Sequence, residues 1–186
     1  MKGKTIRVIL IGTALALAVN AQDSQPPAKT SSRAMGDHQF VTKAAQGGMA
    51  EVQLGQLAQK NASNSSVQQF GQRMATDHAK ANEQLKSLAA QKGITLPSGM
   101  DSKDQSLYRS LSSKTGKDFD KAYITAMIKD HNEDIAEFQH EANSGTDPDI
   151  KAWAAKTLPT LQEHLRLAES CAKQLGISTT PTGGDR

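Results

Sequence analysis

Cysteine is nearly absent from this sequence, because Cys171 is the only one among 186 residues. A single cysteine excludes an intramolecular disulfide, so a stable fold must depend on its hydrophobic core. Aromatic residues make up only 4% of the chain, and runs that alternate β-branched with polar residues are missing. Strands are usually rich in both features. These absences argue against a disulfide-stapled or β-rich protein and favour an all-α fold.

Apolar runs long enough to cross a membrane comfortably are also missing. The longest run, at residues 8–19, ends in the small residues Val19-Asn20-Ala21 and follows a basic start formed by Lys2, Lys4 and Arg7. This order is typical of a secretory signal peptide, which we predict at residues 1–21 with cleavage after Ala21. The residue after the cleavage point is Gln22, so no cysteine is available there for a lipid anchor. We therefore expect a periplasmic or secreted mature protein without a transmembrane segment.

The mature chain has no surplus of either charge. The sequence contains 22 Lys and Arg against 19 Asp and Glu, and the three basic residues of the signal peptide account for the whole difference. The pI of 9.0 is thus a property of the precursor. A nearly neutral chain without a basic cluster gives no reason to expect nucleic acid as a partner. Peripheral association with the cell envelope remains an alternative to a free protein.

Hydrophobic periodicity predicts four long helices and a short one. Apolar residues recur at three- and four-residue spacing over 37–61, 66–92, 117–142 and 147–175, and a shorter pattern covers 101–113. Gly93 and Gly176 are expected to end helices, and Asp147-Pro148 to begin one. Pro159 predicts a kink or a break in the last helix. We predict a bundle domain at 37–176, between a disordered leader at 22–36 and a disordered tail at 177–186.

The connections between these helices predict how the bundle is arranged. Short polar turns at 62–65 and 143–146 predict two antiparallel helix hairpins. The connection at 93–116 is much longer and can travel the length of the bundle. This favours a ferritin-like four-helix bundle with one long crossover that carries the short extra helix. Helices 66–92 and 117–142 would then run in the same direction.

Each predicted long helix has one potential metal ligand near the middle of its apolar face. These residues are Glu51, His78, His131 and His164. Because they lie at similar depth, they can meet in one layer of the bundle. One carboxylate and three imidazoles are a plausible ligand set for zinc, copper or iron. The alternative is a metal-free network in which the buried carboxylate accepts hydrogen bonds from histidines, with water filling the gaps.

Further candidates surround these four residues. An acid precedes each of the three histidines: Asp77, Asp130 and Glu163. These acids could orient histidines of neighbouring helices, add ligands for a second metal, or be ordinary charges at the seams and surface. Met74 and Met127 lie one turn before His78 and His131, where thioether sulfur would favour copper, although core filling is the commoner role of methionine. His140 and His38 are expected to be exposed.

Four segments of the sequence carry a resemblance to a known family. They are FVTKAAQGGMAEVQLGQLA, FGQRMATDHAKANEQLKSLA, FDKAYITAMIKDHNEDIAEF and KAWAAKTLPTLQEHL, within residues 40–175. Together they resemble the exported bacterial domain of unknown function 4142, whose members are grouped with ferritin-like bundles and often labelled candidate outer membrane proteins. The resemblance implies a ferritin-like fold and an envelope location, but it implies no reaction. The motif positions that match are Glu51, Asp77-His78, Asp130-His131 and Glu163-His164.

The sequence supports a metal-binding hypothesis more than an enzymatic one. Ferritin-like di-iron proteins place Glu on two helices and Glu-x-x-His on the other two, whereas here the inward groups are one Glu and three His. A nucleophile with its base, a phosphate loop and a cofactor fingerprint are all missing from the sequence. We therefore interpret the chain as an exported bundle for metal handling or stress protection. A structural or partner-binding envelope protein is one alternative. A metal-dependent oxidase or hydrolase is another, and it would need an open coordination position and a substrate channel.

Overall fold

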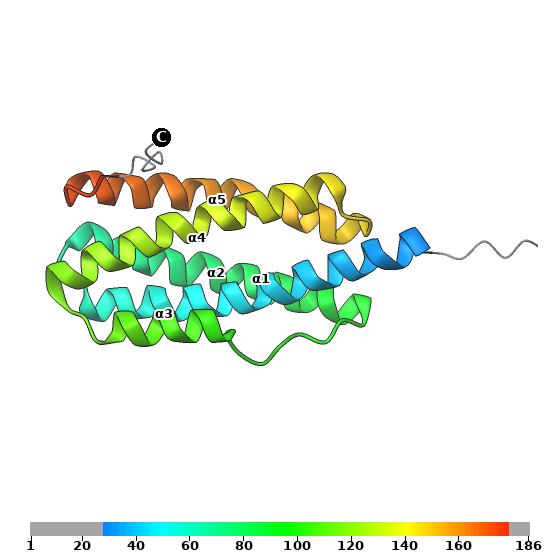
Figure 1. Ribbon diagram of the computed structural model, residues 1–186, viewed down its shortest axis with the longest axis horizontal. Coiled ribbons are helices and arrows are strands. Elements are labelled where there is room, and N and C mark those ends of the chain that lie inside the picture. The colour runs from blue at the N-terminus through cyan, green and yellow to red at the C-terminus, as the bar shows by residue number, and fades with distance from the viewer. Residues whose placement is uncertain (1–27, 179–186) are drawn as a thin grey trace, which may run out of the picture.

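The described part of the chain is helical throughout. A computed structural model describes residues 28–178, with side chains from residue 36 onward. The predicted signal peptide, the first part of the predicted leader and residues 179–186 lie outside the described residues. Residues 28–178 contain five helices and no strand: α1 (Ala28–Asn61), α2 (Ser65–Lys92), α3 (Ser102–Ser112), α4 (Gly116–Ser144) and α5 (Pro148–Gln174). Figure 1 shows how these helices are arranged.

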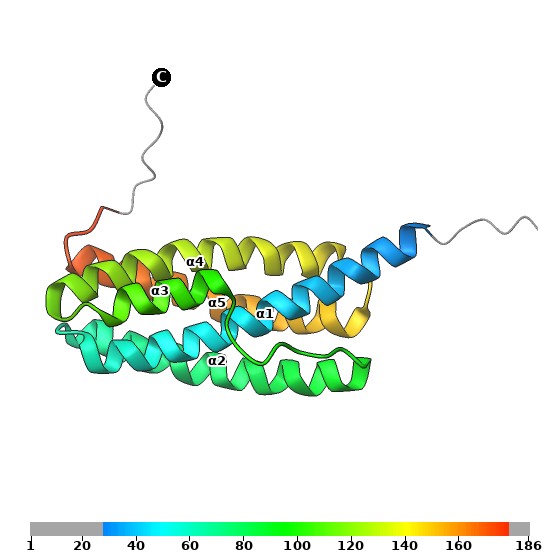
Figure 2. The same cartoon turned by 60° about the horizontal axis from the view of Figure 1, so that its bottom comes forward.

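The four long helices form two antiparallel hairpins, α1 with α2 and α4 with α5. The connection after α2 returns along the bundle and carries α3 before α4 begins (Figures 1 and 2). Consequently α2 and α4 run in the same direction, and so do α1 and α5. The predicted all-α bundle with a single long crossover is confirmed.

Local chemistry explains where two of the helices end. Gly93 and Gly176 both have positive φ, at 67° and 68°, a conformation that glycine adopts without steric cost. After each glycine an isoleucine amide bonds back to a helix carbonyl: Ile94 N donates to Ala89 O and Ile177 N to Ala172 O. Both isoleucines pack against the core. These glycines stop the helices as the sequence predicts, and the apolar residue behind each one anchors the stop.

Two features of the helices differ from the sequence predictions. Helix α1 begins at Ala28, so residues 28–36 of the predicted disordered leader are helical. The segment is polar, but alanine, lysine and arginine within it are good helix formers. Of the kink or break predicted at Pro159, the break is wrong, because α5 continues through this residue. Pro159 and Ala155 are both exposed, so water can reach the Ala155 carbonyl that loses its helical partner.

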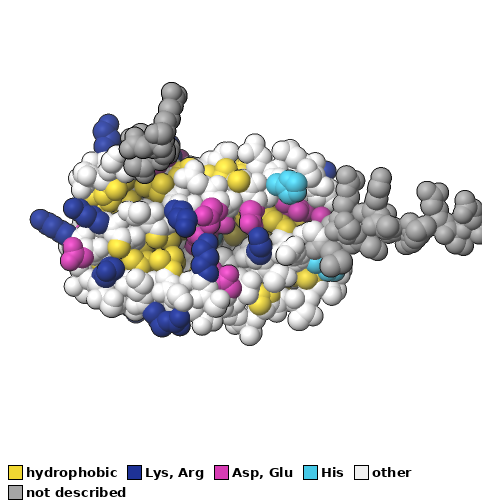
Figure 3. Space-filling view, in the orientation of Figure 1, with side chains coloured by type: hydrophobic (Ala, Val, Ile, Leu, Met, Phe, Trp, Pro, Cys, Tyr) yellow, Lys and Arg dark blue, Asp and Glu magenta, His cyan; other side chains and the backbone are white. Residues whose placement is uncertain are grey.

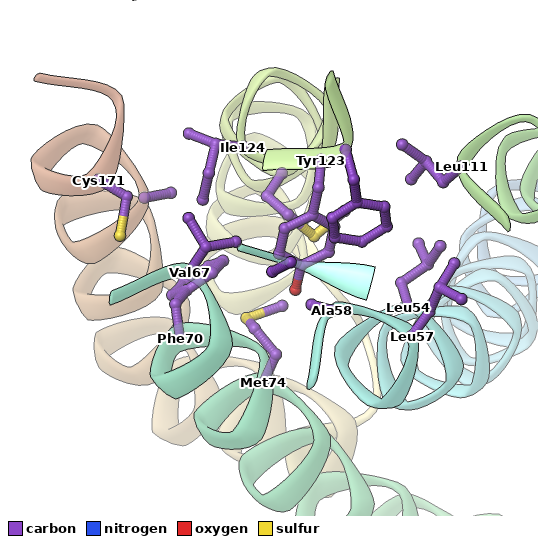
Figure 4. Close-up of a cluster of buried hydrophobic side chains, with 14 of the residues drawn as sticks. Leu54, Leu57, Ala58, Val67, Phe70, Met74, Leu111, Tyr123, Ile124 and Cys171 are labelled. Atoms are coloured by element: carbon purple, nitrogen blue, oxygen red, sulfur yellow. The ribbon is translucent and has the colours of Figure 1, made fainter. Parts of the chain in front are cut away.

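Two hydrophobic clusters form the core and are separated by a polar layer. The first includes Leu54, Phe70, Tyr123 and Ala168 and is drawn in Figure 4. The second includes Phe40, Leu85, Phe138 and Leu161. On every long helix the residues of the two clusters lie on opposite sides of one central polar residue: Glu51 on α1, His78 on α2, His131 on α4 and His164 on α5. The fold therefore brings these four residues to a common depth.

Side chains of both charges appear on the face of the molecule in Figure 3. Acidic and basic side chains lie close to one another near the middle of this face, and basic ones predominate toward its left end. Within residues 28–178, none of the helices is long and apolar enough to cross a membrane.

Glycines allow α1 and α2 to approach closely, which leads to a testable prediction. A Cβ at Gly55 would lie 2.5 Å from the Gly71 carbonyl oxygen and 2.8 Å from the Ala75 nitrogen, both backbone atoms. We expect Gly55→Ala to force the helices apart and lower the free energy of unfolding by about 1–3 kcal/mol, measured by urea denaturation. Gly36→Ala on the same helix is the control, because a Cβ there meets nothing within 4 Å among the described residues. Equal stability of the two variants would contradict the prediction.

Candidate metal centre

The four predicted ligands lie together at the centre of the bundle. Glu51 Oε2 is 2.8 Å from His78 Nδ1, and Glu51 Oε1 is 3.5 Å from His131 Nε2. His131 Nε2 is also 3.4 Å from His164 Nδ1. One ring nitrogen from each of the three histidines lies within 4.8 Å of the others. All four residues are buried, with exposures between 0% and 6%.

The hydrogen bonds of His131 fix its protonation pattern. Its Nδ1 lies 3.0 Å from the Met127 carbonyl oxygen. A carbonyl oxygen can only accept, so Nδ1 must carry the hydrogen. In the neutral ring Nε2 then carries no hydrogen, and its lone pair faces Glu51 and His164.

His164 is oriented in the same way by an acid from another helix. Its Nε2 lies 3.0 Å from Asp77 Oδ2. Although burial raises the pKa of Asp77, hydrogen bonds from Arg73 and His164 outweigh this and hold it below its usual value. Asp77 is therefore an ionised carboxylate that accepts a hydrogen bond from His164 Nε2. In the neutral ring His164 Nδ1 then carries no hydrogen and presents a lone pair.

Two lone pairs thus face each other across 3.4 Å, between His131 Nε2 and His164 Nδ1. Neither nitrogen has a hydrogen to donate, so this contact is not a hydrogen bond between neutral rings. Burial lowers the pKa of both imidazoles to about 4, which keeps them neutral at physiological pH. Such an arrangement is repulsive by itself and becomes favourable when a cation lies between the nitrogens.

Further polar atoms in this layer have no partner. Within residues 36–178, Glu51 Oε1, His78 Nε2 and the Tyr123 hydroxyl are buried and make no hydrogen bond. Leaving such a group unpaired typically costs about 1–3 kcal/mol. Burial raises the pKa of Glu51 to about 8 and lowers that of His78 to about 4. A bound cation would offset these costs, because it attracts both the carboxylate and the nitrogen lone pairs.

Two aspartates of α4 add carboxylates beside Glu51. Oxygens of Glu51, Asp130 and Asp134 lie within 4.8 Å of one another. Burial raises the pKa of Asp130, and burial together with the charge of Glu51 raises that of Asp134 well above its usual value. The group is rich in oxygen ligands, which suit harder cations than the imidazoles do.

The other sequence candidates occupy different surroundings. Of the three acids that precede the histidines, Asp77 contacts the histidine of another helix and Asp130 joins the carboxylates. Glu163 instead forms an ion pair with Arg166 three residues along α5, where both side chains are partly exposed. Met74 and Met127 are buried in the first hydrophobic cluster. His38 and His140 are exposed.

Sequence reasoning missed Asp134 and Tyr123, although a signal for each exists. Asp134 follows His131 by three residues and Asp130 by four, so it shares the side of α4 between them. Tyr123 lies on the same stripe as Met127 and His131 at four-residue spacing. In a sequence pattern it is a core aromatic. The fold buries its hydroxyl, and burial together with the charge of Glu51 raises the pKa of Tyr123.

A small cavity reaches the centre from one side. Its volume is about 40 Å³, and its lining runs from Glu51, His78 and Asp134 to Lys43 and Glu137. Lys43 and Glu137 form an ion pair of 2.9 Å, with side chains 55% and 45% exposed. The cavity therefore connects buried ligands with the protein surface.

Gly47 lies in the wall of this cavity, one turn before Glu51 on α1. A Cβ at Gly47 would meet nothing within 4 Å among the described residues, unlike one at Gly48, Gly55 or Gly71. Glycine inside a helix costs roughly 0.5–1 kcal/mol relative to alanine. Neither close packing nor a positive φ explains glycine at this position. Its effect is to leave the cavity open.

The fold and the centre together define a class: helical bundles with a buried layer of histidine and carboxylate side chains. The chain matches the family described as "Domain of unknown function (DUF4142)" over residues 21–171. It belongs to this family, as the sequence resemblance predicts.

Solved structures with the same fold come from another family of unassigned function. A DUF305 protein from Streptomyces coelicolor, described as a candidate secreted protein, superposes with a TM-score of 0.66 at 13% identity, covering 80% of this chain and 98% of its own. A DUF305 fragment from Deinococcus radiodurans gives a TM-score of 0.65 at 14% identity, covering 76% and 95%. At such low identity the likeness concerns the fold alone. No curated protein matches the chain.

Proposed function

We propose that this protein binds one transition-metal ion through His78, His131 and His164, with Glu51 as an oxygen ligand. The ion would be zinc, copper or iron, all of which accept imidazole nitrogen and carboxylate oxygen. We further propose that the protein is exported and serves metal handling or protection against metal stress. The signal-like first 21 residues and the description of the Streptomyces relative support export.

The lone pairs of His131 and His164 are the observation on which the metal proposal depends. They face each other at 3.4 Å while the opposite ring nitrogens are held by the Met127 carbonyl and Asp77. Metal-binding histidines usually donate their second nitrogen to such acceptors. The same bonds fix the rings in position before the ion arrives, so little ordering is needed on binding.

A metal-free polar network is the second candidate, and the short bond between Glu51 and His78 favours it. At 2.8 Å Glu51 Oε2 and His78 Nδ1 form a hydrogen bond that shares one proton, so each of these two atoms has a partner. The network would then serve to fix how the four helices pack, in a structural or partner-binding protein of the envelope. It differs from the first proposal in requiring no ion.

Metal content distinguishes the two candidates. The purified protein is stripped with a chelator, loaded separately with Zn²⁺, Cu²⁺ or Fe²⁺ under suitable redox conditions, freed of excess ion and measured by elemental analysis. We expect about one ion per chain for at least one metal, and a raised Tm, since a ligand at a hundred times its Kd adds about 2.7 kcal/mol. A variant with His38→Ala and His140→Ala tests the exposed histidines and should bind equally well. A parent chain that retains none of the three ions would favour the metal-free network.

A further inference from the structure

The cavity beside the centre has an inner and an outer end of different character. At the inner end lie Glu51 and His78, which each carry a buried atom without a hydrogen-bond partner in residues 36–178. At the outer end lie Lys43 and Glu137, both partly exposed. A passage between such ends connects the protein surface with unpaired polar groups. The proposed metal site does not by itself require a passage of this kind.

The volume of the cavity limits what it can hold. A cavity must offer at least about 10–15 Å³ to hold one water molecule. The 40 Å³ of this cavity therefore provides about three water-sized positions. The ion pair between Lys43 and Glu137 contributes one charge of each sign at the outer end, so the entrance selects by size more than by charge. Phe40, Phe138 and Leu161 also line the cavity and restrict its width.

Gly47 keeps the cavity open at a cost to the helix. The position tolerates a side chain sterically, because nothing among the described residues lies within 4 Å of a Cβ there. Alanine would favour the helix and begin to fill the cavity. Neither packing nor backbone conformation requires glycine at this position, and its lack of a side chain leaves this part of the cavity unfilled.

We propose that the cavity admits a small exogenous ligand, of at most about three non-hydrogen atoms, to the metal ion. This inference rests on the proposed metal site. The three histidines and Glu51 supply four ligands, so a five-coordinate ion would keep one position open for a further ligand. An open position is what distinguishes reactive metal sites from purely structural ones. The ligand would coordinate through an oxygen or nitrogen lone pair, as water, peroxide or azide do.

Azide binding to the Co²⁺-loaded protein tests the proposal. Co²⁺ accepts the same ligands as Zn²⁺, and its visible absorption changes when a ligand is added to the ion. We expect azide to change the spectrum of the parent protein saturably. Imidazole, whose ring is wider than linear azide, should leave the spectrum unchanged. Gly47→Leu should retain Co²⁺ but bind azide at least about tenfold more weakly, because its side chain occupies the cavity. Gly47→Ala should have a smaller effect in the same direction.

Gly36→Leu is the matched control, because it places the same side chain in open space on the same helix. It should bind azide as the parent does. Bound Co²⁺ with no response to azide would overturn the cavity proposal while leaving the metal site intact. Equal azide affinity in the parent and Gly47→Leu would also overturn it, since the ligand would then use another route. A parent that binds neither Co²⁺ nor any of the three ions tested above would overturn both proposals.

Discussion

His131→Gln is expected to weaken metal binding by at least about a hundredfold. Changes to residues that only orient a ligand typically cost 10–100-fold in affinity, and removal of the ligand itself should cost more. His131 is the central member of the proposed set, because its Nε2 faces both Glu51 and His164. Glutamine keeps a polar side chain of similar size, which limits the effect on folding. The measurement is a competition titration of the metal-loaded protein against a chelator of known affinity.

His140→Gln is the matched control for this prediction. It makes the same substitution on the same helix, α4, but at an exposed position. We expect its metal affinity to equal that of the parent. If His131→Gln bound metal as tightly as His140→Gln, the ion would have to lie elsewhere, and the proposed ligand set would be wrong. Circular dichroism of both variants in the metal-free state checks that the helices are intact.

Helix positions could be predicted because local residues determine them. Asp147 accepts hydrogen bonds from the amides of Asp149 and Ile150, and so begins α5 where the sequence predicts it. Gly93 ends α2 by the same kind of local chemistry. The start of α1 has no comparable signal, since a polar segment of good helix formers precedes Asp37. The composition of this segment predicted a disordered leader, and only the structure revealed that residues 28–36 are helical.

The position of each candidate ligand along its helix could also be predicted. The rotation of the helices about their axes and the directions of the side chains could not. The four central residues meet because each lies near the middle of the helix that the sequence predicts. The observed α1 begins earlier, at Ala28, so Glu51 lies past the midpoint of that helix. Which acid contacts which histidine depends on helix rotation and side-chain direction. Asp77 reaches from α2 to His164 on α5, while Glu163 pairs with Arg166 on its own helix. Both precede a histidine in the sequence, so the pattern alone could not separate them.

Asp37 has a role that the sequence did not predict. Predicted as the first residue of a helix, it lies within α1 and accepts hydrogen bonds at the far turn between α4 and α5. Its carboxylate accepts from the backbone amides of Thr146 and Asp147 and from the Thr146 hydroxyl. These bonds outweigh the effect of burial and lower the pKa of Asp37. The first hairpin thereby holds the turn of the second.

Asp120 makes the reciprocal contact at the other end of the bundle. It lies on α4, is fully buried, and holds the turn between α1 and α2. Its carboxylate accepts from the amides of Ser63 and Asn64, at 3.1 and 3.0 Å, and from the Ser63 hydroxyl at 2.6 Å. Each hairpin thus supplies one aspartate that satisfies the turn of its partner. The two contacts fix the register between the hairpins independently of the central layer.

Asp120→Ala is therefore expected to lower the free energy of unfolding by about 3 kcal/mol, because hydrogen bonds to a charged group contribute about 1.5–3 kcal/mol each and do not add fully. For a chain of this size the Tm should fall by about 6–12 °C. Asp120→Asn keeps one acceptor oxygen and should lose less. Asp118→Ala is the control, since Asp118 is exposed two residues earlier on α4 and its loss should change stability by less than about 0.5 kcal/mol. Similar melting temperatures for Asp120→Ala and Asp118→Ala would show that the turn is held by packing, and that the buried carboxylate contributes little to joining the hairpins.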